Sequence, residues 1–400
     1  MTANGRGSGD EGPIARHEGR DRRARQERDE RESHGRAARL EPSAGHARRV
    51  AVLGAGSFGT ALALRLYDNG HDVVLWGRDP AHIAEIAERR ENVRYLPGVR
   101  LPAFDLTPSL KAALKDADVV VFVVPSQAMR KVAQGAAPHL SSSALIVHAA
   151  KGLESGSLKR MSEVLADVLP TEIASRIVAL SGPSHAEDVA RNLPTTVVVA
   201  GARQAAEAAQ SVFFAPSFRV YTNDDLVGVE IAGALKNIIA LGAGLSDGLG
   251  YGDNAKAALI TRGLHEIARL GVHLGAHPLT FAGLAGIGDL IVTATSRHSR
   301  NRRAGRMLGE GLPLPEVLKR IGMVVEGVKT TEAAYALAGL HGVSMPITRE
   351  LYLVLFEGKT PRQAVEDLLA REPTEEGADF LLSAWVGRRA RTGAPANGNP

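Results

Sequence analysis

A lysine inside an apolar segment is the first residue of this chain that could do chemistry. Lys236 lies in residues 227–242, where Glu230 and Asn237 are the other polar side chains. A helix that is apolar on every side is usually buried, and lysine is rarely buried unless it is paired or takes part in a reaction. Burial lowers the pKa of an ammonium group toward neutrality, which suits proton transfer. The pattern predicts a catalytic Lys236; a structural ion pair with Glu230 is the alternative.

A dense basic cluster is the second candidate. Residues 299–303 read Ser-Arg-Asn-Arg-Arg, and they follow a glycine-rich stretch, 286–293, that contains Asp289 and Thr293. Arginine binds phosphate through two parallel hydrogen bonds, and serine and asparagine add neutral donors. We therefore predict that Ser299, Arg300 and Asn301 bind a phosphate group, although a solvated charged loop would show the same composition. Residues 286–293 are expected to form a glycine turn that positions the acid and the hydroxyl.

A glycine-rich turn predicts a third kind of site. Residues 50–59 read VAVLGAGSFG, which places the pattern G-x-G-x-x-G after an apolar strand and at the start of a helix. Gly54 permits the tight turn, Gly56 lets the backbone approach a pyrophosphate, and Gly59 allows close contact between helix and sheet. The N–H groups at the helix start then face the phosphates. We expect a dinucleotide to bind here.

The end of the next strand indicates which dinucleotide. NAD sites usually carry an acid there, hydrogen-bonded to the ribose 2′-hydroxyl. This chain has Trp-Gly-Arg-Asp at 76–79. Arg78 suits a 2′-phosphate, whereas Asp79 would serve NAD if the register differed by one residue. NADP is favoured, with NAD tolerated.

Two loops that follow apolar strands also carry polar groups. Residues 150–154 include Lys151, and residues 180–186 include Gly182 and Ser184. Ligands of open α/β sheets lie beyond the carboxyl ends of the strands, so both loops are placed to contact a ligand.

Alternating apolar strands and helices predict a doubly wound, Rossmann-type parallel sheet in the N-terminal half. The expected strands cover residues 50–53, 73–76, 119–124, 145–149, 177–180, 196–200 and 218–221. The expected helices among them cover residues 59–68, 81–89 and 110–115. After residue 222 the strand pattern fades, and the expected helices cover residues 227–245, 254–274, 302–308, 314–320, 330–340, 347–356 and 361–369. We thus predict a dinucleotide-binding domain, 48–222, and a mostly α-helical substrate and catalytic domain, 223–387.

Composition narrows the class of protein. The 400 residues are 44% hydrophobic, enough for two packed cores, and contain no cysteine, which rules out disulfides and thiolate metal sites. Residues 1–47 alternate acids with arginines and hold few large apolar side chains, so we predict a disordered tail there and another at 388–400. The net charge of +4 is not gathered into a basic face with stacking aromatics, which argues against a nucleic-acid partner. No apolar run approaches the length of a membrane span, and the N-terminus lacks a secretory signal, so we predict no membrane insertion.

Together these motifs resemble the bacterial NAD(P)-dependent glycerol-3-phosphate dehydrogenases. The resemblance runs from about residue 50 to residue 369. Its matching pieces are GAGSFGTALA (54–63), VLWGRD (74–79), YLPG (95–98), VPS (124–126), KGLE (151–154), SGPSHA (181–186), FRVY (218–221), GALKNIIALGAGLSDGLG (233–250), ALITRG (258–263), GLAGIGDL (283–290), SRNRR (299–303) and VVEG (324–327).

The resemblance implies a role for each matching residue. Lys236 would be the general acid and base of the reaction. The implied substrate contacts are Lys151, Gly182, Ser184, Lys236, Asn237, Asp289, Ser299, Arg300 and Asn301. The implied contacts to NADP or NAD are Gly54, Gly56, Ser57, Phe58, Gly59, Arg78, Tyr95, Lys151, Ala186, Arg300, Val324 and Glu326.

The resemblance also implies the reaction and its setting. A cytoplasmic homodimer would interconvert dihydroxyacetone phosphate and sn-glycerol 3-phosphate without a metal, and would supply phospholipid synthesis. A reductase of the ketopantoate or hydroxyisobutyrate type is the alternative enzyme. Such an enzyme needs no phosphate-binding site of the kind predicted for residues 299–303. A non-catalytic regulator that binds NADPH is the alternative from another class of protein. Such a regulator would not need a lysine inside an apolar helix, as Lys236 is.

Overall fold

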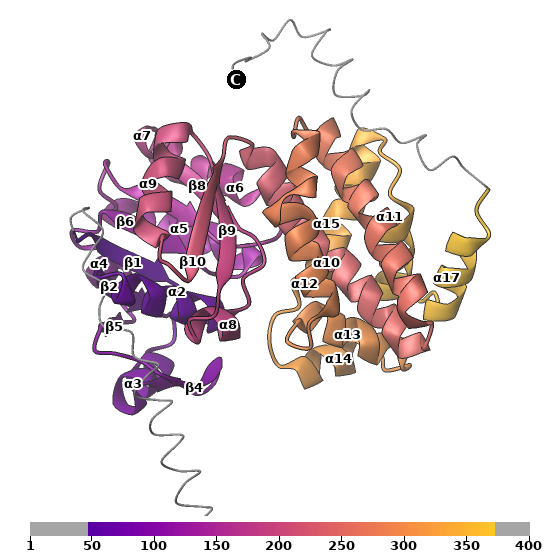
Figure 1. The fold of residues 1–400 in the computed structure, drawn as a ribbon, viewed down its shortest axis with the longest axis horizontal. Helices are drawn as coiled ribbons and strands as arrows, with labels where there is room; N and C mark the ends of the chain where they lie inside the picture. The colour runs from indigo at the N-terminus through magenta and orange to yellow at the C-terminus, as the bar shows by residue number, and fades with distance from the viewer. Residues whose placement is uncertain (1–46, 373–400) are drawn as a thin grey trace, which may run out of the picture. The chain divides into compact units, whose positions relative to one another are not determined.

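The computed structural model describes residues 47–372 of the chain. A sheet part comes first along the chain, and a helical part follows from residue 226 (Figure 1). The two predicted tails lie outside the described residues, apart from residue 47.

One eight-stranded sheet forms the middle of the sheet part, in the order β10-β9-β8-β7-β6-β1-β2-β5. Its strands are β1 (Arg49–Leu53), β2 (Asp72–Trp76), β5 (Asp105–Thr107), β6 (Val119–Phe122), β7 (Leu145–His148), β8 (Ile177–Ser181), β9 (Thr195–Ala200) and β10 (Phe218–Asn223). The expectation of an all-parallel sheet was wrong for β9 and β10. The β8–β9 pair is antiparallel, whereas β10 is parallel to β9. Residues 182–194 join β8 to β9, so this reversal needs no full helical crossover.

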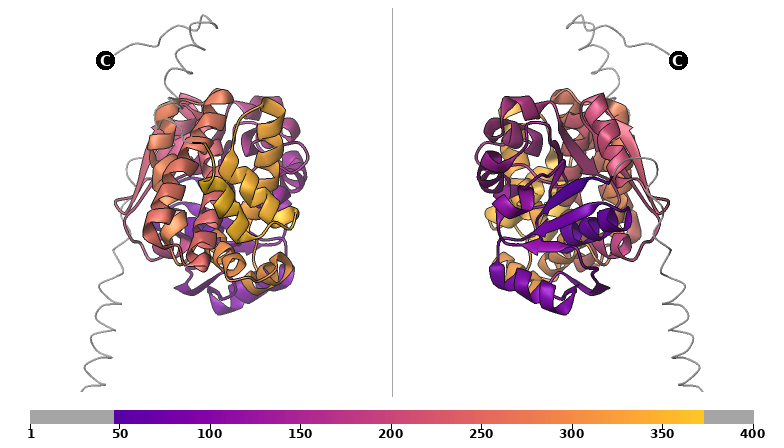
Figure 2. Two further views of the ribbon diagram at one scale, coloured as in Figure 1. Left: turned by 90° about the vertical axis from the view of Figure 1, so that its right-hand side faces the viewer. Right: turned by 90° about the vertical axis from the view of Figure 1, so that its left-hand side faces the viewer.

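Helices cover both faces of the sheet, as the apolar strands require. Successive side chains of a strand point to opposite faces, so Val50 and Val52 enter one core, and Ala51 and Leu53 enter the other. The helices of this part are α2 (Ser57–Asp68), α3 (Pro80–Arg89), α4 (Leu110–Leu114), α5 (Met129–Ala136), α6 (Met161–Val168), α7 (Thr171–Ala174), α8 (Ala186–Ala190) and α9 (Arg203–Phe213). Short 3₁₀ turns span Ser126–Ala128 and Ala137–His139. The sequence pattern had missed α5 to α9. The right-hand view of Figure 2 has this sheet part in front, and the left-hand view has the helical part in front.

A small hairpin lies beside the glycine-rich turn. Its strands are β3 (Glu91–Asn92) and β4 (Leu96–Arg100), which pair with each other in a separate two-stranded sheet. No strand was expected here from the sequence, because β3 has only two residues and β4 contains a proline and a glycine, which obscure a strand pattern.

The helical part is built around α10 (Leu226–Leu249). Its other helices are α11 (Gly252–His273), α12 (Asp289–Thr295), α13 (Arg300–Gly309), α14 (Leu314–Ile321), α15 (Glu326–His341), α16 (Pro346–Phe356) and α17 (Pro361–Leu369), with a 3₁₀ turn at Pro278–Ala282. The expectation that no apolar run approaches the length of a membrane span was wrong for α10, which by length and composition could cross a membrane. However, 89% of its most apolar window is buried inside the protein. Its apolar surface is therefore covered by neighbouring elements, as in the core helix of a globular fold.

Glycines let α13 pack backbone to backbone against α10. A Cβ atom on Gly244 would lie 1.9 Å from the carbonyl oxygen of Arg302, and one on Gly305 would lie 1.8 Å from that of Leu241. Side chains at either position would push the helices apart. This close packing fixes the start of α13, with its basic cluster, relative to the helix that carries Lys236.

Three boundaries in the helical part correct the sequence predictions. The expected glycine turn, 286–293, is limited to its first residues: the backbone kinks at Gly286 (φ −85°, ψ −108°), and the residues from Asp289 onward belong to α12. Helix α13 begins at Arg300 rather than 302, because the Ser299 hydroxyl caps it by accepting a hydrogen bond from the Arg302 N–H. Helix α15 begins at Glu326 rather than 330. The charged loop considered as an alternative for residues 299–303 is thus the first turn of a helix.

Candidate functional site

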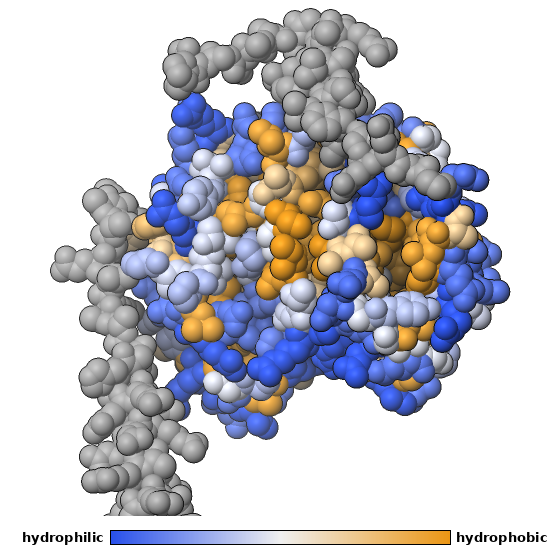
Figure 3. Space-filling model, turned by 45° about the vertical axis from the view of Figure 1, so that its right-hand side comes forward, coloured by the Kyte–Doolittle hydropathy of each residue, from blue (hydrophilic) through white to orange (hydrophobic). Residues whose placement is uncertain are grey.

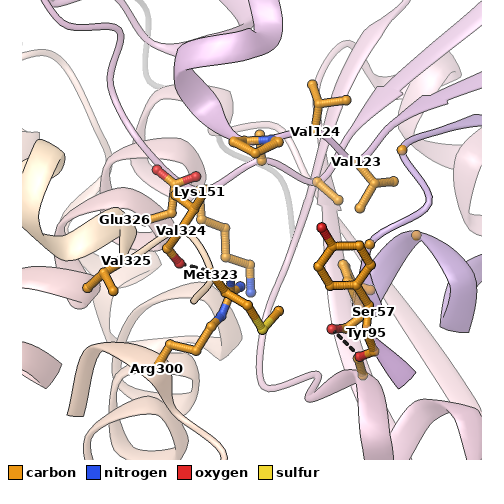
Figure 4. A pocket seen from close by; sticks show the side chains of 18 of the residues that line it. Ser57, Tyr95, Val123, Val124, Lys151, Arg300, Met323, Val324, Val325 and Glu326 are labelled. Carbon is orange, nitrogen blue, oxygen red and sulfur yellow. Dashed lines mark hydrogen bonds between the residues drawn. The ribbon is translucent and has the colours of Figure 1, made fainter. Parts of the chain in front are cut away.

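A cleft of about 1120 Å³ is lined by both the sheet part and the helical part. Most of the predicted site residues face it (Figure 4). Those among its lining are Gly54, Gly56, Ser57, Phe58, Gly59, Arg78, Tyr95, Lys151, Ser184, Ala186, Lys236, Asn237, Asp289, Ser299, Arg300, Asn301, Val324 and Glu326. Gly182 is not among the lining residues, but its carbonyl oxygen accepts hydrogen bonds from two of them, the Lys151 ammonium and the Ser184 hydroxyl, both at 3.1 Å.

The glycine-rich turn has the geometry that a dinucleotide requires. Gly54 has φ = +131°, and a Cβ atom there would lie 2.4 Å from the Val123 carbonyl oxygen. A Cβ atom on Gly59 would lie 1.8 Å from the Gly54 carbonyl oxygen, so only glycine lets α2 start this close to the strand. Gly56 has open space around it and lines the cleft. The turn therefore leaves room for a pyrophosphate at the N-terminus of α2.

The contacts at the end of β2 separate the two candidates for binding the cofactor's ribose, Arg78 and Asp79. The Asp79 carboxylate caps α3 by accepting hydrogen bonds from the N–H groups of Ala81, at 3.1 Å, and His82, at 3.4 Å. Arg78 is exposed and lines the cleft. The acid is thus engaged by its own helix, and the arginine is available to a ligand.

Lys236 is buried beside an acid from another helix. Its Nζ donates hydrogen bonds to Asp289 Oδ1 and, at 2.6 Å, to Thr293 Oγ1. Lys151 Nζ lies 2.7 Å from the other oxygen of the same carboxylate. Two ammonium groups thus share one buried carboxylate at the floor of the cleft.

The alternative partner proposed for Lys236 was wrong. Glu230 binds elements of the sheet part instead: its carboxylate accepts hydrogen bonds from the Ser162 N–H at 2.7 Å and from Arg160 at 2.5 Å. Six residues along an α-helix place two side chains about 120° apart around the axis, so Glu230 and Lys236 cannot face the same neighbour.

Burial and the opposite charge of the partner shift the pKa values of Lys236 and Asp289 in opposite directions. Burial, partly offset by the Asp289 carboxylate, lowers the pKa of Lys236 to about 7. Burial disfavours the carboxylate of Asp289 too, but the ammonium groups of Lys151 and Lys236 outweigh it and hold the pKa of Asp289 below its usual range. Burial thus moves the pKa of the lysine toward neutrality, and the two ammonium groups favour the ionised form of the acid.

Two asparagines join α10 to the start of α13. Asn301 Nδ2 donates to Asn237 Oδ1 at 2.8 Å, and Asn301 Oδ1 accepts from the Gly327 N–H at 2.9 Å. Asn237 Nδ2 in turn donates to the Lys151 carbonyl oxygen at 3.1 Å. This chain of hydrogen bonds ties the strand-end loop that carries Lys151 to both helices, which fixes the relative positions of the two lysines.

Arg300 and Glu326 form the rim of the cleft on the helical side (Figure 4). Arg300 Nη1 donates to the Val324 carbonyl oxygen at 2.9 Å. The Glu326 carboxylate accepts hydrogen bonds from the Ser126 N–H, at 3.1 Å, and the Ser126 hydroxyl, at 2.6 Å. Ser126 follows β6, so this pair links the sheet part to the helical part directly. Burial raises the pKa of Glu326, although the bonds from Ser126 act against it.

Two side chains in this network were not assigned from the sequence. Thr293 binds Lys236, and it stands four residues after Asp289 on α12; expecting a helix there would have placed both on one face. Ser126 lies immediately beyond β6, at the carboxyl end of the sheet where ligands of such folds bind.

Comparisons with known proteins identify the family to which this chain is similar. The family model described as NAD-dependent glycerol-3-phosphate dehydrogenase N-terminus matches residues 49–207, and its C-terminal counterpart matches residues 225–366. The chain is 55% identical over 336 residues to the glycerol-3-phosphate dehydrogenase [NAD(P)+] of Bacillus velezensis, covering 84% of this chain and 97% of that one. It is 59% identical over 334 residues to that of Geobacillus kaustophilus, covering 83% and 97%.

A solved structure shows the same likeness. The crystal structure of glycerol-3-phosphate dehydrogenase from Coxiella burnetii matches with a TM-score of 0.78 at 42% identity, over 81% of this chain and 99% of that one. The glycine-rich turn, the buried Lys236 beside Asp289 and the two matching family models lead to one conclusion. The chain belongs to the NAD(P)-dependent glycerol-3-phosphate dehydrogenases, oxidoreductases that interconvert dihydroxyacetone phosphate and sn-glycerol 3-phosphate.

Proposed function

We propose that this cleft reduces dihydroxyacetone phosphate with NADPH or NADH as the hydride source, and that Lys236 supplies the proton. The observation that carries the proposal is the cluster of Lys236, Lys151 and Asp289 at the floor of a cleft whose other end is the glycine-rich turn. As the C2 carbonyl carbon gains hydride, its oxygen gains negative charge. Lys236 Nζ donates a proton to that oxygen and removes it again in the reverse reaction.

Asp289 and Lys151 position the proton donor. A single carboxylate bound to both ammonium groups holds Lys236 in one orientation, and Thr293 Oγ1 fixes a second of its hydrogen bonds. The positive charge of Lys151 favours the neutral form of Lys236, whereas Asp289 favours the ammonium form. The balance keeps the pKa of Lys236 close to the pH at which it must both give and take a proton.

The phosphate of the substrate is held at the start of α13 in this proposal. Arg300 lines the cleft in the first turn of that helix, where the N–H groups also favour an anion. Ser299 and Asn301 are buried, and their side chains cap the helix and bind Asn237 and Gly327. We therefore give Arg300 the direct charged contact. Binding of the remote phosphate orients the carbonyl toward Lys236.

An assay of pH dependence tests the proposed reaction. Purified protein with NADPH should reduce dihydroxyacetone phosphate, and ketopantoate should be a poor substrate. Because the pKa of Lys236 is lowered to about 7 and reduction needs the ammonium, kcat/KM for reduction should be steady below that pH and fall above it, by about tenfold per unit. Oxidation of sn-glycerol 3-phosphate should show the opposite trend. Equal or faster reduction of ketopantoate, or two parallel pH profiles, would contradict the assignment.

We also propose that the cofactor preferred is NADPH, because Arg78 is available for a 2′-phosphate and Asp79 is occupied. Replacing Arg78 by alanine should raise KM for NADPH about tenfold or more, since a hydrogen bond to a charged group contributes about 1.5–3 kcal/mol. KM for NADH should change little, since that cofactor lacks the phosphate. Steady-state kinetics with each cofactor measures this, and an equal change for both would show that Arg78 does not bind the 2′-phosphate.

We further propose a cytoplasmic homodimer that supplies sn-glycerol 3-phosphate to glycerophospholipid synthesis, as the family resemblance implies. On the face drawn in Figure 3, hydrophobic residues gather in a band near the middle, with hydrophilic residues around it. Large apolar side chains such as Leu279 and Ile291 are exposed on the described surface. Gathered apolar surface of this kind supports association with a second copy.

A further inference from the structure

The β3–β4 hairpin is fixed against the glycine-rich turn by buried hydrogen bonds. Asn92 is fully buried, and its Nδ2 donates to the Ala55 carbonyl oxygen at 3.0 Å and to Thr60 Oγ1 at 2.7 Å. Ser57 Oγ, in the first turn of α2, donates to the Tyr95 carbonyl oxygen at 2.6 Å. The segment between the two strands is therefore held directly beside the expected pyrophosphate position.

Helix α3 supports the same hairpin from its other side. His82 Nε2 lies 3.0 Å from Asn92 Oδ1, and the rings of His82 and Tyr95 meet edge to face with centroids 5.2 Å apart. His82 and Tyr95 both line the cleft. The hairpin and the start of α3 thus form one continuous wall at the cofactor end of the cleft. Arg78, two residues before α3, belongs to the same wall.

Arg94 stands at the turn of this hairpin. It is exposed, it lines the cleft, and its guanidinium carbon lies 5.1 Å from the centre of the Tyr95 ring. Stacking on an aromatic ring orients the guanidinium and leaves its edge, with the N–H donors, open to a ligand. Among residues 47–372, no carboxylate forms an ion pair with Arg94.

The acids close in sequence to Arg94 and Arg78 are already engaged. Glu91 Oε1 accepts a hydrogen bond from the Gly98 N–H at 2.7 Å, which closes the hairpin. The Asp79 carboxylate caps α3. This wall of the cleft therefore presents two arginines whose neighbouring carboxylates are occupied elsewhere, an arrangement that favours an anionic ligand.

We infer that Arg94 is a phosphate-binding residue for the dinucleotide, acting from the hairpin beside the N-terminus of α2. The inference rests on the proposed seating of the cofactor at the glycine-rich turn. Arginine binds a phosphate through parallel charged hydrogen bonds, and the stacked Tyr95 ring keeps the guanidinium in place before the ligand arrives. The phosphate is either the pyrophosphate, which NADPH and NADH share, or the 2′-phosphate, which NADPH alone carries.

The test is direct binding of each cofactor to the full-length Arg94→Gln variant, followed through the nicotinamide fluorescence of NADPH and NADH. Glutamine keeps a polar side chain at an exposed turn, so the thermal midpoint should not change. We expect the Kd for NADPH to rise about tenfold or more, as for the loss of one charged hydrogen bond to phosphate. The dependence of log Kd on log salt concentration should become weaker, because one ion pair is lost.

The matched control is Arg100→Gln, which removes the same charge from an exposed position on β4 that does not line the cleft. Its Kd values should equal those of the wild type. A loss confined to NADPH identifies the 2′-phosphate as the ligand of Arg94, and an equal loss for both cofactors identifies the pyrophosphate. Unchanged affinity in Arg94→Gln would overturn the inference while leaving the function intact. A wild type that binds neither cofactor would contradict the proposed function itself.

Discussion

Replacing Lys236 by methionine should lower kcat for dihydroxyacetone phosphate reduction by roughly 10²–10⁴, the usual contribution of general acid–base catalysis. Methionine keeps most of the side-chain volume and loses only the titrating ammonium. The buried Asp289 carboxylate still has Lys151 at 2.7 Å, so the substitution does not leave an unpaired charge in the core. Affinity for NADPH should barely change, because the glycine-rich turn that binds its phosphates is untouched. Single-turnover kinetics and cofactor titration measure the two effects.

Two further measurements separate proton transfer from a structural role of Lys236. Lys111→Met removes an exposed lysine from α4, outside the cleft, and should leave kcat unchanged. In Lys236→Ala, a small primary amine added to the solution should restore part of the rate, in proportion to its ammonium form. Near-normal kcat in Lys236→Met at neutral pH would make the lysine a structural partner of Asp289. Lys151 would then be the next candidate for the proton donor.

Replacing Arg300 by alanine should raise KM for dihydroxyacetone phosphate by about ten- to a hundredfold, from the loss of about 1.5–3 kcal/mol of charged hydrogen bonding. The value of kcat should fall as well, since the phosphate contact orients the carbonyl toward Lys236. Inorganic phosphate should compete with the substrate in the wild type and lose that effect in the variant. Initial rates over a grid of substrate and phosphate concentrations measure both constants.

The neighbouring arginine provides the control for Arg300. Arg303 belongs to the same basic cluster and the same helix, but it is exposed and does not line the cleft. Arg303→Ala should therefore keep both the KM and the phosphate inhibition of the wild type. If Arg300→Ala raised KM for NADPH and left KM for dihydroxyacetone phosphate unchanged, Arg300 would bind the cofactor, at the edge of the cleft near Val324, instead of the substrate.

Local sequence was sufficient for the fold class and for the cofactor end of the cleft. The glycine-rich turn depends on about ten consecutive residues, whose strand, turn and helix are set by short-range sterics and hydrogen bonds. The burial of Lys236 follows from apolar neighbours on every side of its own helix. Helix starts were predicted less well, because the Ser299 cap and the run of arginines after it form a helix without an apolar stripe. The directions of β9 and β10 leave no local pattern, since parallel and antiparallel strands have the same periodicity.

The burial of a lysine and the dinucleotide turn that leads into α2 both follow from the sequence alone. Which acid binds that lysine depends on how the helices pack in three dimensions. Asp289 lies 53 residues away from Lys236 and reaches it because α12 packs on α10. Glu230, much nearer in sequence, points to another face of α10 and binds Arg160 and Ser162. Side-chain direction on a helix and the packing of helices against one another, rather than distance along the chain, set the partners at this site.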